Sequence, residues 1–210
     1  MFVWDFHGVL EQNTELATLE ISNSVLEKQG YVERFTKDDI IKLYGKKWFE
    51  FFEYLLPYEP RETHLRLQSL CFTNQDWSII EKHIIATPNA GLVLEAISKK
   101  HQQIVISNTQ PESITRFLTS VSLEQYFDTS SAIAVNAHNN LGMTKADALR
   151  EFITDKNFDD FIFIGDSPGD MELKKVFGGV TYLFVHPHLK HKNCEADYRI
   201  TDLREVLKEL

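Results

Sequence analysis

Polar side chains that can do chemistry directly follow three apolar runs of this sequence. Asp5 follows the first run, Ser107 and Asn108 close the second, and Asp166 follows a third. If these runs are parallel strands of one sheet, the side chains gather at its carboxyl edge, where open α/β proteins bind their ligands. One polar residue at a strand end would mean little, but three together form a candidate site.

The residue types at these positions suit phosphoryl chemistry. A carboxylate such as Asp5 can attack phosphorus and divide one difficult displacement into two easier ones. The carboxylates of Asp166 and Asp170 are ligands of the kind that Mg²⁺ prefers, together with water and substrate phosphate. Ser107 offers a hydroxyl to a phosphate oxygen, and Lys145 offers a compact positive charge. Each of these residues could also serve an ordinary structural role in a turn, a cap or the surface.

The apolar runs are short and rich in Ile, Val and Phe, as strands buried on both faces of a sheet should be. Segments with the apolar spacing of helices lie between them, and this alternation indicates parallel βαβ units. The sequence therefore predicts an α/β fold with a doubly wound parallel sheet, built from residues 1–10 and 88–210. The expected strands are 2–4, 103–107, 132–135, 161–164 and 181–185.

Residues 11–87 follow a different pattern. They contain several amphipathic helical stretches and no strand-like run. Thr36 and Asp39 have the spacing of a capping box at the start of one helix, with Asp in place of the usual Glu. We therefore expect residues 11–87 to form an all-helical insert between the first and second strands of the sheet.

Four motifs, taken in order, resemble those of the haloacid dehalogenase-like hydrolase superfamily. They are WDFHGVL at 4–10, VISNTQ at 105–110, Lys145 within LGMTKADAL, and IGDSPGD at 164–170. The helical insert lies where that superfamily places its cap, so the resemblance covers nearly the whole chain. It implies a Rossmann-like catalytic core, with the insert as a helical cap that closes over the carboxyl ends of the strands.

The resemblance also implies a metal site for Mg²⁺. Asp5, Asp166 and the backbone carbonyl of His7 would bind the metal, and Asp170 would support them. Asp5 would in addition be the nucleophile of the reaction.

A second group of residues would bind the substrate. We expect Ser107, Asn108 and Lys145 to contact the phosphate of the substrate. Lys145 would also neutralise charge shared by Asp5 and the phosphoryl group. Many relatives have a proline after this lysine, whereas this chain has Ala146.

Position 7 departs from the family pattern, because His7 stands where the phosphatase branch has a second aspartate. In that branch this residue protonates the leaving alkoxide and later activates water. A histidine can hold and release a proton near neutral pH, so it is chemically able to do both. Three interpretations stay open. In the first, His7 acts as the acid/base; in the second, it marks a slow site or one suited to good leaving groups such as acyl phosphates; in the third, the chemistry differs altogether.

Composition limits the partners and the compartment. The chain has 210 residues and a net charge of −9, which argues against a nucleic-acid backbone or an anionic membrane surface as its partner. No apolar run approaches the ~18 residues of a membrane span. Cys71 and Cys194 are far apart and have no zinc-binding spacing, and no secretory signal pattern is present. We therefore expect a reduced, cytoplasmic protein, and the oligomeric state stays open.

These observations favour Mg²⁺-dependent hydrolysis of a small phosphate monoester, a phosphorylated metabolite, through an aspartyl-phosphate intermediate. A metal-free dehalogenase is one alternative, in which the same aspartate displaces halide from carbon. The paired carboxylates Asp166 and Asp170 would then have no purpose. The other alternative is a catalytically weak or inert phosphate-binding protein that keeps the scaffold without the acid/base.

Overall fold

The computed structural model of the protein describes residues 1–73, 76–135, 143–156, 158, 160–186 and 194–209. These residues divide into two compact units. One unit combines Met1–Gln12 with the described residues from Ile85 onward, and the other is Asn13–Ile84. The chain therefore leaves the first unit soon after its first strand and returns to it after a run of helices.

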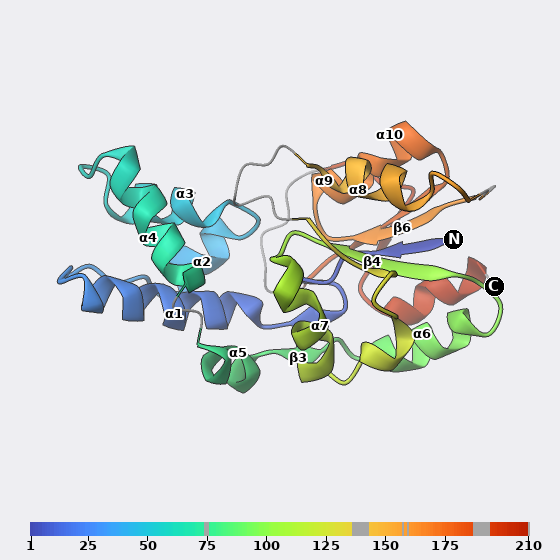
Figure 1. Cartoon of the computed structure of the whole chain (residues 1–210), viewed down its shortest axis with the longest axis horizontal. Helices are drawn as coiled ribbons and strands as arrows, with labels where there is room; N and C mark the ends of the chain where they lie inside the picture. Colours follow the sequence, from blue (N-terminus) through green and yellow to red (C-terminus); the bar gives the residue numbers. More distant parts are fainter. Residues whose placement is uncertain (74–75, 136–142, 157, 159, 187–193, 210) are drawn as a thin grey trace. The chain divides into compact units, whose positions relative to one another are not determined.

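The first unit is built on a six-stranded sheet. Its strands are β1 (Phe2–Trp4), β4 (Gln103–Ser107), β5 (Ala132–Ala134), β6 (Ile162–Gly165), β7 (Val180–Phe184) and β8 (Tyr198–Ile200). Their order is β5-β4-β1-β6-β7-β8, and all neighbouring strands are parallel (Figure 1). From β1 the chain builds one side of the sheet with β4 and β5, and then the other side with β6, β7 and β8. The prediction of a doubly wound parallel sheet is confirmed.

Helices cover both faces of this sheet. They are α6 (Ala90–Ser98), α7 (Pro111–Ser120), the 3₁₀ helix η1 (Glu124–Tyr126), α8 (Lys145–Phe152), α9 (Pro168–Met171), α10 (Leu173–Phe177) and the 3₁₀ helix η2 (Leu203–Glu209). Figure 1 shows α8, α9 and α10 on one face, with α6 and the C-terminal η2 on the other. Contacts agree with this arrangement, since α8 meets β4 and α10, and α6 meets η2.

Apolar side chains of the central strands form the core beneath α8 and α10. Val3 of β1 lies in register with Ile104 of β4 and with Phe163 of β6, and all three side chains are buried. Residues in register on parallel strands point to the same face, so the three form one layer. The same cluster includes Ile106, Val135, Ala148, Leu149, Phe161 and Leu173.

The second unit is helical. Its helices are α1 (Thr14–Lys28), α2 (Lys37–Leu43), α3 (Trp48–Leu55), α4 (Arg61–Thr73) and α5 (Trp77–His83). The predicted capping box is present at the start of α2, where the hydroxyl of Thr36 accepts the Asp39 N–H at 3.2 Å and the Asp39 carboxylate accepts the Thr36 N–H at 2.8 Å. The ring of Phe35 lies 6.3 Å from that of Phe51 and 5.7 Å from that of Phe52, so the unit has a core of its own. Within the described ranges no helix is long and apolar enough to cross a membrane.

The expectation that residues 11–87 contain no strand is wrong. β2 (Glu11–Gln12) pairs antiparallel with β3 (Ile85–Ala86) and joins the two ends of the helical insertion. A strand of two residues is too short to show alternation of apolar and polar side chains, so periodicity could not reveal it. The pairing depends on backbone groups that only the folded chain brings together.

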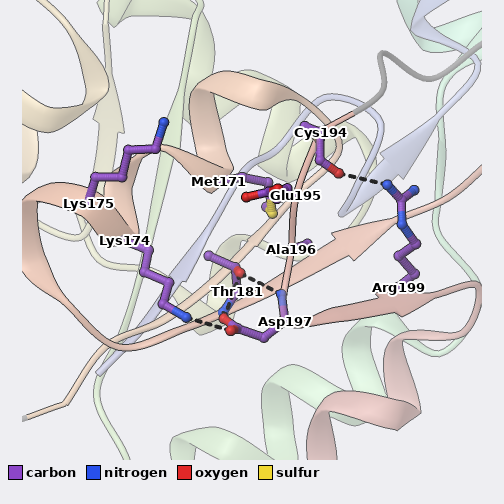
Figure 2. Close-up of a pocket in the computed structure, with 9 residues that line it drawn as sticks. All are labelled: Met171, Lys174, Lys175, Thr181, Cys194, Glu195, Ala196, Asp197 and Arg199. Atoms are coloured by element: carbon purple, nitrogen blue, oxygen red, sulfur yellow. Dashed lines mark hydrogen bonds and ion pairs between the residues drawn. The ribbon is translucent and has the colours of Figure 1, made fainter.

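The edge strand β8 was also not expected, because Tyr198 and Arg199 are both exposed and its pattern is not that of a buried strand. Asp197 attaches it to β7. The Asp197 carboxylate accepts the N–H and the hydroxyl of Thr181, both at 2.8 Å, and lies 2.5 Å from Nζ of Lys174. Figure 2 shows this group beside a pocket of about 930 Å³, which none of the predicted site residues lines.

Replacing Asp197 with asparagine should weaken this edge of the sheet. Lys174 and the donors of Thr181 lower the pKa of Asp197 to about 2, below the value of about 3.9 in an unfolded chain. Its stabilisation is therefore complete above pH ~4 and is lost as the pH falls toward about 2. We expect Asp197→Asn to lower the free energy of unfolding by about 1 kcal/mol at neutral pH, and by less in acid, in urea titrations.

The matched control is Asp155→Asn, which changes a solvent-exposed carboxylate and should leave the free energy of unfolding unchanged. If Asp197→Asn is as stable as the wild type at neutral pH, Asp197 does not anchor β8.

Candidate active site

Asp5 lies at the carboxyl end of β1, between the ends of β4 and β6. Its backbone N–H donates to the carbonyl of Ile164 in β6 at 2.8 Å. Its carboxylate accepts the N–H of Phe6 at 2.8 Å, and the residue is 9% exposed. The strand pairing therefore holds the backbone of Asp5, and the carboxylate is nearly buried at the edge of the sheet.

Lys145 joins two of the predicted site carboxylates. Its Nζ lies 2.7 Å from Oδ1 of Asp5 and 2.6 Å from Oδ1 of Asp170, and the residue is buried. Lys145 is also the first residue of α8, where a positive charge meets the positive end of the helix dipole. A capping box between Thr144 and Asp147 stabilises this helix start and places an acidic residue in its first turn.

The side chain of Asp170 packs against Gly165 at the end of β6. Its second oxygen accepts the hydroxyl of Ser167 at 2.6 Å and the Ser167 N–H at 3.1 Å, which caps α9. A Cβ at position 165 would collide with the side chain of Asp170, so only glycine, Gly165, permits this close approach. Asp170 thus contacts Ser167 through one oxygen and Lys145 through the other.

Asp166 completes an acidic cluster with Asp5 and Asp170. One oxygen of each carboxylate lies within 4.8 Å of the others. These three carboxylates and the ammonium of Lys145 carry a net charge of −2 when all four groups are ionised. An all-oxygen donor set of this charge fits a hard divalent cation. Four of the predicted site residues are therefore brought together by the fold.

Burial and the repulsion of Asp170 raise the pKa of Asp5 to about 6, against the opposing effect of Lys145. For Lys145, burial by itself would lower the pKa, but the carboxylates of Asp170 and Asp5 outweigh it and raise the pKa. The lysine therefore stays protonated. A cation bound to the cluster would favour the ionised form of Asp5, which is the form that can act as a nucleophile.

Ser107, the last residue of β4, is fully buried. Its carbonyl accepts the N–H groups of Thr109 and Val135 at 2.9 and 2.7 Å. Its hydroxyl has no hydrogen-bond partner in the part of the chain that the structure describes. Such a group costs about 1–3 kcal/mol unless a ligand satisfies it. Asn108, the next residue, is exposed, and the roles of both residues stay predictions.

His7 lies in the loop after β1 and contacts a residue that the sequence analysis did not select. Its Nδ1 is 3.0 Å from Oε1 of Glu11, a carboxylate that is fully buried. An acidic residue four positions after a histidine was the signal available in the sequence. Outside a helix this spacing implies no contact, which is why Glu11 was missed. The roles of His7, as acid/base and as a carbonyl ligand of the metal, stay predictions.

The fold and the site define an α/β enzyme core with a cluster of carboxylates and a buried lysine at the carboxyl edge of a parallel sheet. A family model described as haloacid dehalogenase-like hydrolase matches residues 2–182. The chain therefore belongs to the haloacid dehalogenase-like hydrolases, and the family expected from the four motifs is confirmed.

Solved structures share this fold at low sequence identity. A haloacid dehalogenase-like hydrolase from Streptococcus pneumoniae is 15% identical, with a TM-score of 0.76 over 99% of this chain and 96% of its own. A predicted phosphoglycolate phosphatase from Haemophilus somnus is 13% identical, with a TM-score of 0.77 over 100% of this chain and 96% of its own. A family hydrolase from Deinococcus radiodurans with bound phosphate and sodium is 15% identical, with a TM-score of 0.69 over 98% of this chain and 92% of its own. A comparison with curated protein sequences finds no match.

Replacing Gly165 with alanine should displace Asp170 from Lys145. The added methyl group would occupy the space of the Asp170 side chain, and overpacking of this kind costs about 1–3 kcal/mol. We expect that loss in the free energy of unfolding, measured by denaturant titration. Gly169→Ala is the matched control, because its Cβ would lie 3.7 Å from its nearest neighbour, an oxygen of Ser167. Equal stability of the two variants would show that Asp170 moves without cost.

Proposed function

We propose that the protein is a Mg²⁺-dependent phosphatase that hydrolyses a small phosphate monoester through an aspartyl-phosphate on Asp5. The observation that carries this proposal is the buried ammonium of Lys145, 2.7 Å from Asp5 and 2.6 Å from Asp170, with Asp166 in the same cluster. Phosphoryl transfer requires a nucleophile, fixed positive charge and a place for a hard cation. This cluster supplies all three at one edge of the sheet.

The reaction would proceed in two steps. Asp5 would attack phosphorus through a carboxylate oxygen while the bond from phosphorus to the leaving oxygen breaks, and His7 would give that oxygen a proton. The imidazole would then take a proton from a water molecule, whose oxygen attacks the aspartyl-phosphate and releases phosphate and free Asp5. Lys145 would offset the negative charge of Asp5 and the phosphoryl group in both steps.

The carboxylates of Asp5 and Asp166 and the backbone carbonyl of His7 would hold Mg²⁺, with support from Asp170. When bound, the ion would neutralise negative charge on the phosphoryl oxygens. The clustered carboxylate oxygens of Asp5, Asp166 and Asp170, within 4.8 Å of one another, support a divalent ion at this place.

Ser107 and Asn108 would bind oxygens of the phosphoryl group. The support for Ser107 is its buried hydroxyl, which has no partner within the described residues. A phosphate oxygen would accept its hydrogen and remove the cost of leaving it unsatisfied.

A small phosphorylated metabolite is the proposed substrate. Two structural relatives support phosphate chemistry, since one is a predicted phosphoglycolate phosphatase and the other has bound phosphate. The net charge of −9 disfavours nucleic acid. We propose that the helical unit, Asn13–Ile84, serves as the cap that selects the substrate. The free thiols of Cys71 and Cys194 support a reducing, cytoplasmic location.

Asp5→Asn should abolish Mg²⁺-dependent phosphate release from nitrophenyl phosphate. An amide is not a competent nucleophile here, so we expect kcat to fall at least about 1000-fold. The activated leaving group needs little protonation, so this substrate tests the nucleophile and the metal separately from His7. Phosphate release is measured with Mg²⁺ and with EDTA, and thermal unfolding shows that the variant is folded. Asp155→Asn, a change in an exposed carboxylate, is the control.

Other outcomes would favour other functions. EDTA-resistant release of halide from a haloacid would identify a metal-free dehalogenase. Tight binding of a phosphate analogue without turnover would identify an inert phosphate-binding protein. If the wild type with Mg²⁺ does not turn over nitrophenyl phosphate, the phosphatase proposal is wrong.

Ser107→Ala should weaken substrate binding without weakening the fold. Because its hydroxyl has no partner in the described structure, its removal should not lower the free energy of unfolding, whereas losing a hydrogen bond to phosphate should raise KM about 10-fold. Ser22→Ala is the contrasting control for stability. Ser22 is also fully buried, but its hydroxyl accepts Nε1–H of Trp48 at 2.7 Å, so its loss should cost about 1 kcal/mol. An unchanged KM in Ser107→Ala would remove Ser107 from the phosphate site.

A further inference from the structure

Glu11 is a buried carboxylate that the reaction described above does not use. It begins β2 and is fully buried. Moving an ionised carboxylate out of water is costly unless hydrogen bonds or a partner charge compensate it. Buried titratable groups with specific partners beside a catalytic residue are candidates for a functional role.

Two contacts of Glu11 lead directly to the loop after Asp5. Its Oε1 lies 3.0 Å from Nδ1 of His7 and accepts the N–H of Gly8 at 3.3 Å. A carboxylate in its ionised form only accepts hydrogen bonds, so an ionised Glu11 requires the hydrogen on Nδ1 of His7. In that tautomer Nε2 is the ring nitrogen that does not face Glu11.

The loop backbone keeps His7 and Glu11 together. The carbonyl of Phe6 accepts the N–H groups of residues 9–11 at 3.0 to 3.2 Å, which closes a tight turn. Gly8 has a φ of +76°, a conformation that glycine adopts without steric cost. The carbonyl of Gly8 accepts Nε2–H of His186, which follows β7. Hydrogen bonds on both sides of His7 therefore hold the turn.

Aromatic contacts restrict the orientation of the His7 ring. Phe6 and Phe117 of α7 meet it nearly edge-on, with centroid distances of 5.1 and 4.8 Å and interplanar angles of 80° and 89°. Arrangements of this kind are favourable for aromatic pairs. The side chain of His7 is still 25% exposed. The ring is thus held by a carboxylate and two aromatic side chains, and part of it remains accessible to a ligand.

We propose that Glu11 is the positioning residue of His7, whose Nδ1–H it holds so that Nε2 faces the leaving oxygen of the substrate. This inference rests on the proposed phosphatase function and deepens it. Nε2 gives its proton to the leaving oxygen as the bond to phosphorus breaks, and it takes one from the attacking water in the second step. Nδ1 of His7 keeps its hydrogen and continues to donate it to the Glu11 carboxylate in both steps. An imidazole has two inequivalent nitrogens and can turn over, so it needs an orienting partner to transfer a proton efficiently.

Leaving-group dependence tests the proposal in the presence of Mg²⁺. Glu11→Gln replaces the carboxylate by an amide of the same shape, which accepts more weakly and can donate to Nδ1 and so admit the other tautomer. We expect kcat for phenyl phosphate to fall at least about 10-fold more than kcat for nitrophenyl phosphate, because only the poorer leaving group needs the proton. His7→Ala should show the same change, and the double variant His7→Ala/Glu11→Gln should show no more than His7→Ala.

Gln12→Ala is the control for the local strand. It changes the residue next to Glu11 and keeps the backbone pairing with Ile85, so its leaving-group dependence should match the wild type. An equal loss for both aryl phosphates in Glu11→Gln would show that Glu11 has a structural role only. A Glu11→Gln enzyme that behaves like the wild type would also overturn the proposal.

Long-range ¹H–¹⁵N correlation spectra of the histidine rings test the positioning without substrate or turnover. The His7 signals are assigned by their absence in His7→Ala. The neutral ring should be the Nδ1–H tautomer in the wild type and a mixture of tautomers in Glu11→Gln. A wild-type ring in the Nε2–H tautomer would exclude the proposed contact without any variant. If the wild type does not turn over either aryl phosphate, the phosphatase function fails, and these spectra still decide whether Glu11 positions His7.

Discussion

The site depends on the ammonium of Lys145, held between the carboxylates of Asp5 and Asp170. Attraction and repulsion at these distances are strong because the groups are buried, and a buried carboxylate without the lysine would be costly. The partners come from the end of β1, the start of α8 and the start of α9, so one electrostatic contact joins three elements. With Asp166, these two carboxylates form a cluster of three acidic side chains at the edge of the sheet.

The loop after β1 carries two of the predicted site residues, Asp5 and His7, and each is held in place by a different contact. Its first residue, Asp5, is held by the sheet, and His7 is held by Glu11 within a turn that the carbonyl of Phe6 closes. A carboxylate in place of His7 would have two equivalent oxygens and would need no partner to select between them. The imidazole does need one, so the histidine and the buried Glu11 are best understood together. The histidine at position 7 is therefore accompanied by a buried partner that an aspartate there would not need.

The helical unit forms its own core and its own helix caps, as the packing of Phe35 against Phe51 and Phe52 shows. The short pair of β2 (Glu11–Gln12) and β3 (Ile85–Ala86) joins the points where the chain leaves the first unit and returns to it. This pair holds the ends of the insertion together through backbone hydrogen bonds, which place few demands on the inserted sequence. Glu11 belongs to the pair, so the residue that holds His7 also lies where the insertion begins.

The sequence by itself determined the class of fold and the residues of the acidic cluster. Strands buried on both faces must be continuously apolar, so five of the six sheet strands were visible as short runs, and a capping box such as that of Thr36 depends only on residues three positions apart. Only the tertiary structure decided that Lys145 forms an ion pair with Asp170 and that the side chain of Glu11 contacts that of His7. It also decided the pairing of β2 and the place of β8 at the edge of the sheet. The physical reason is that these contacts depend on how turns and distant segments meet in space, and neither apolar periodicity nor residue spacing records that.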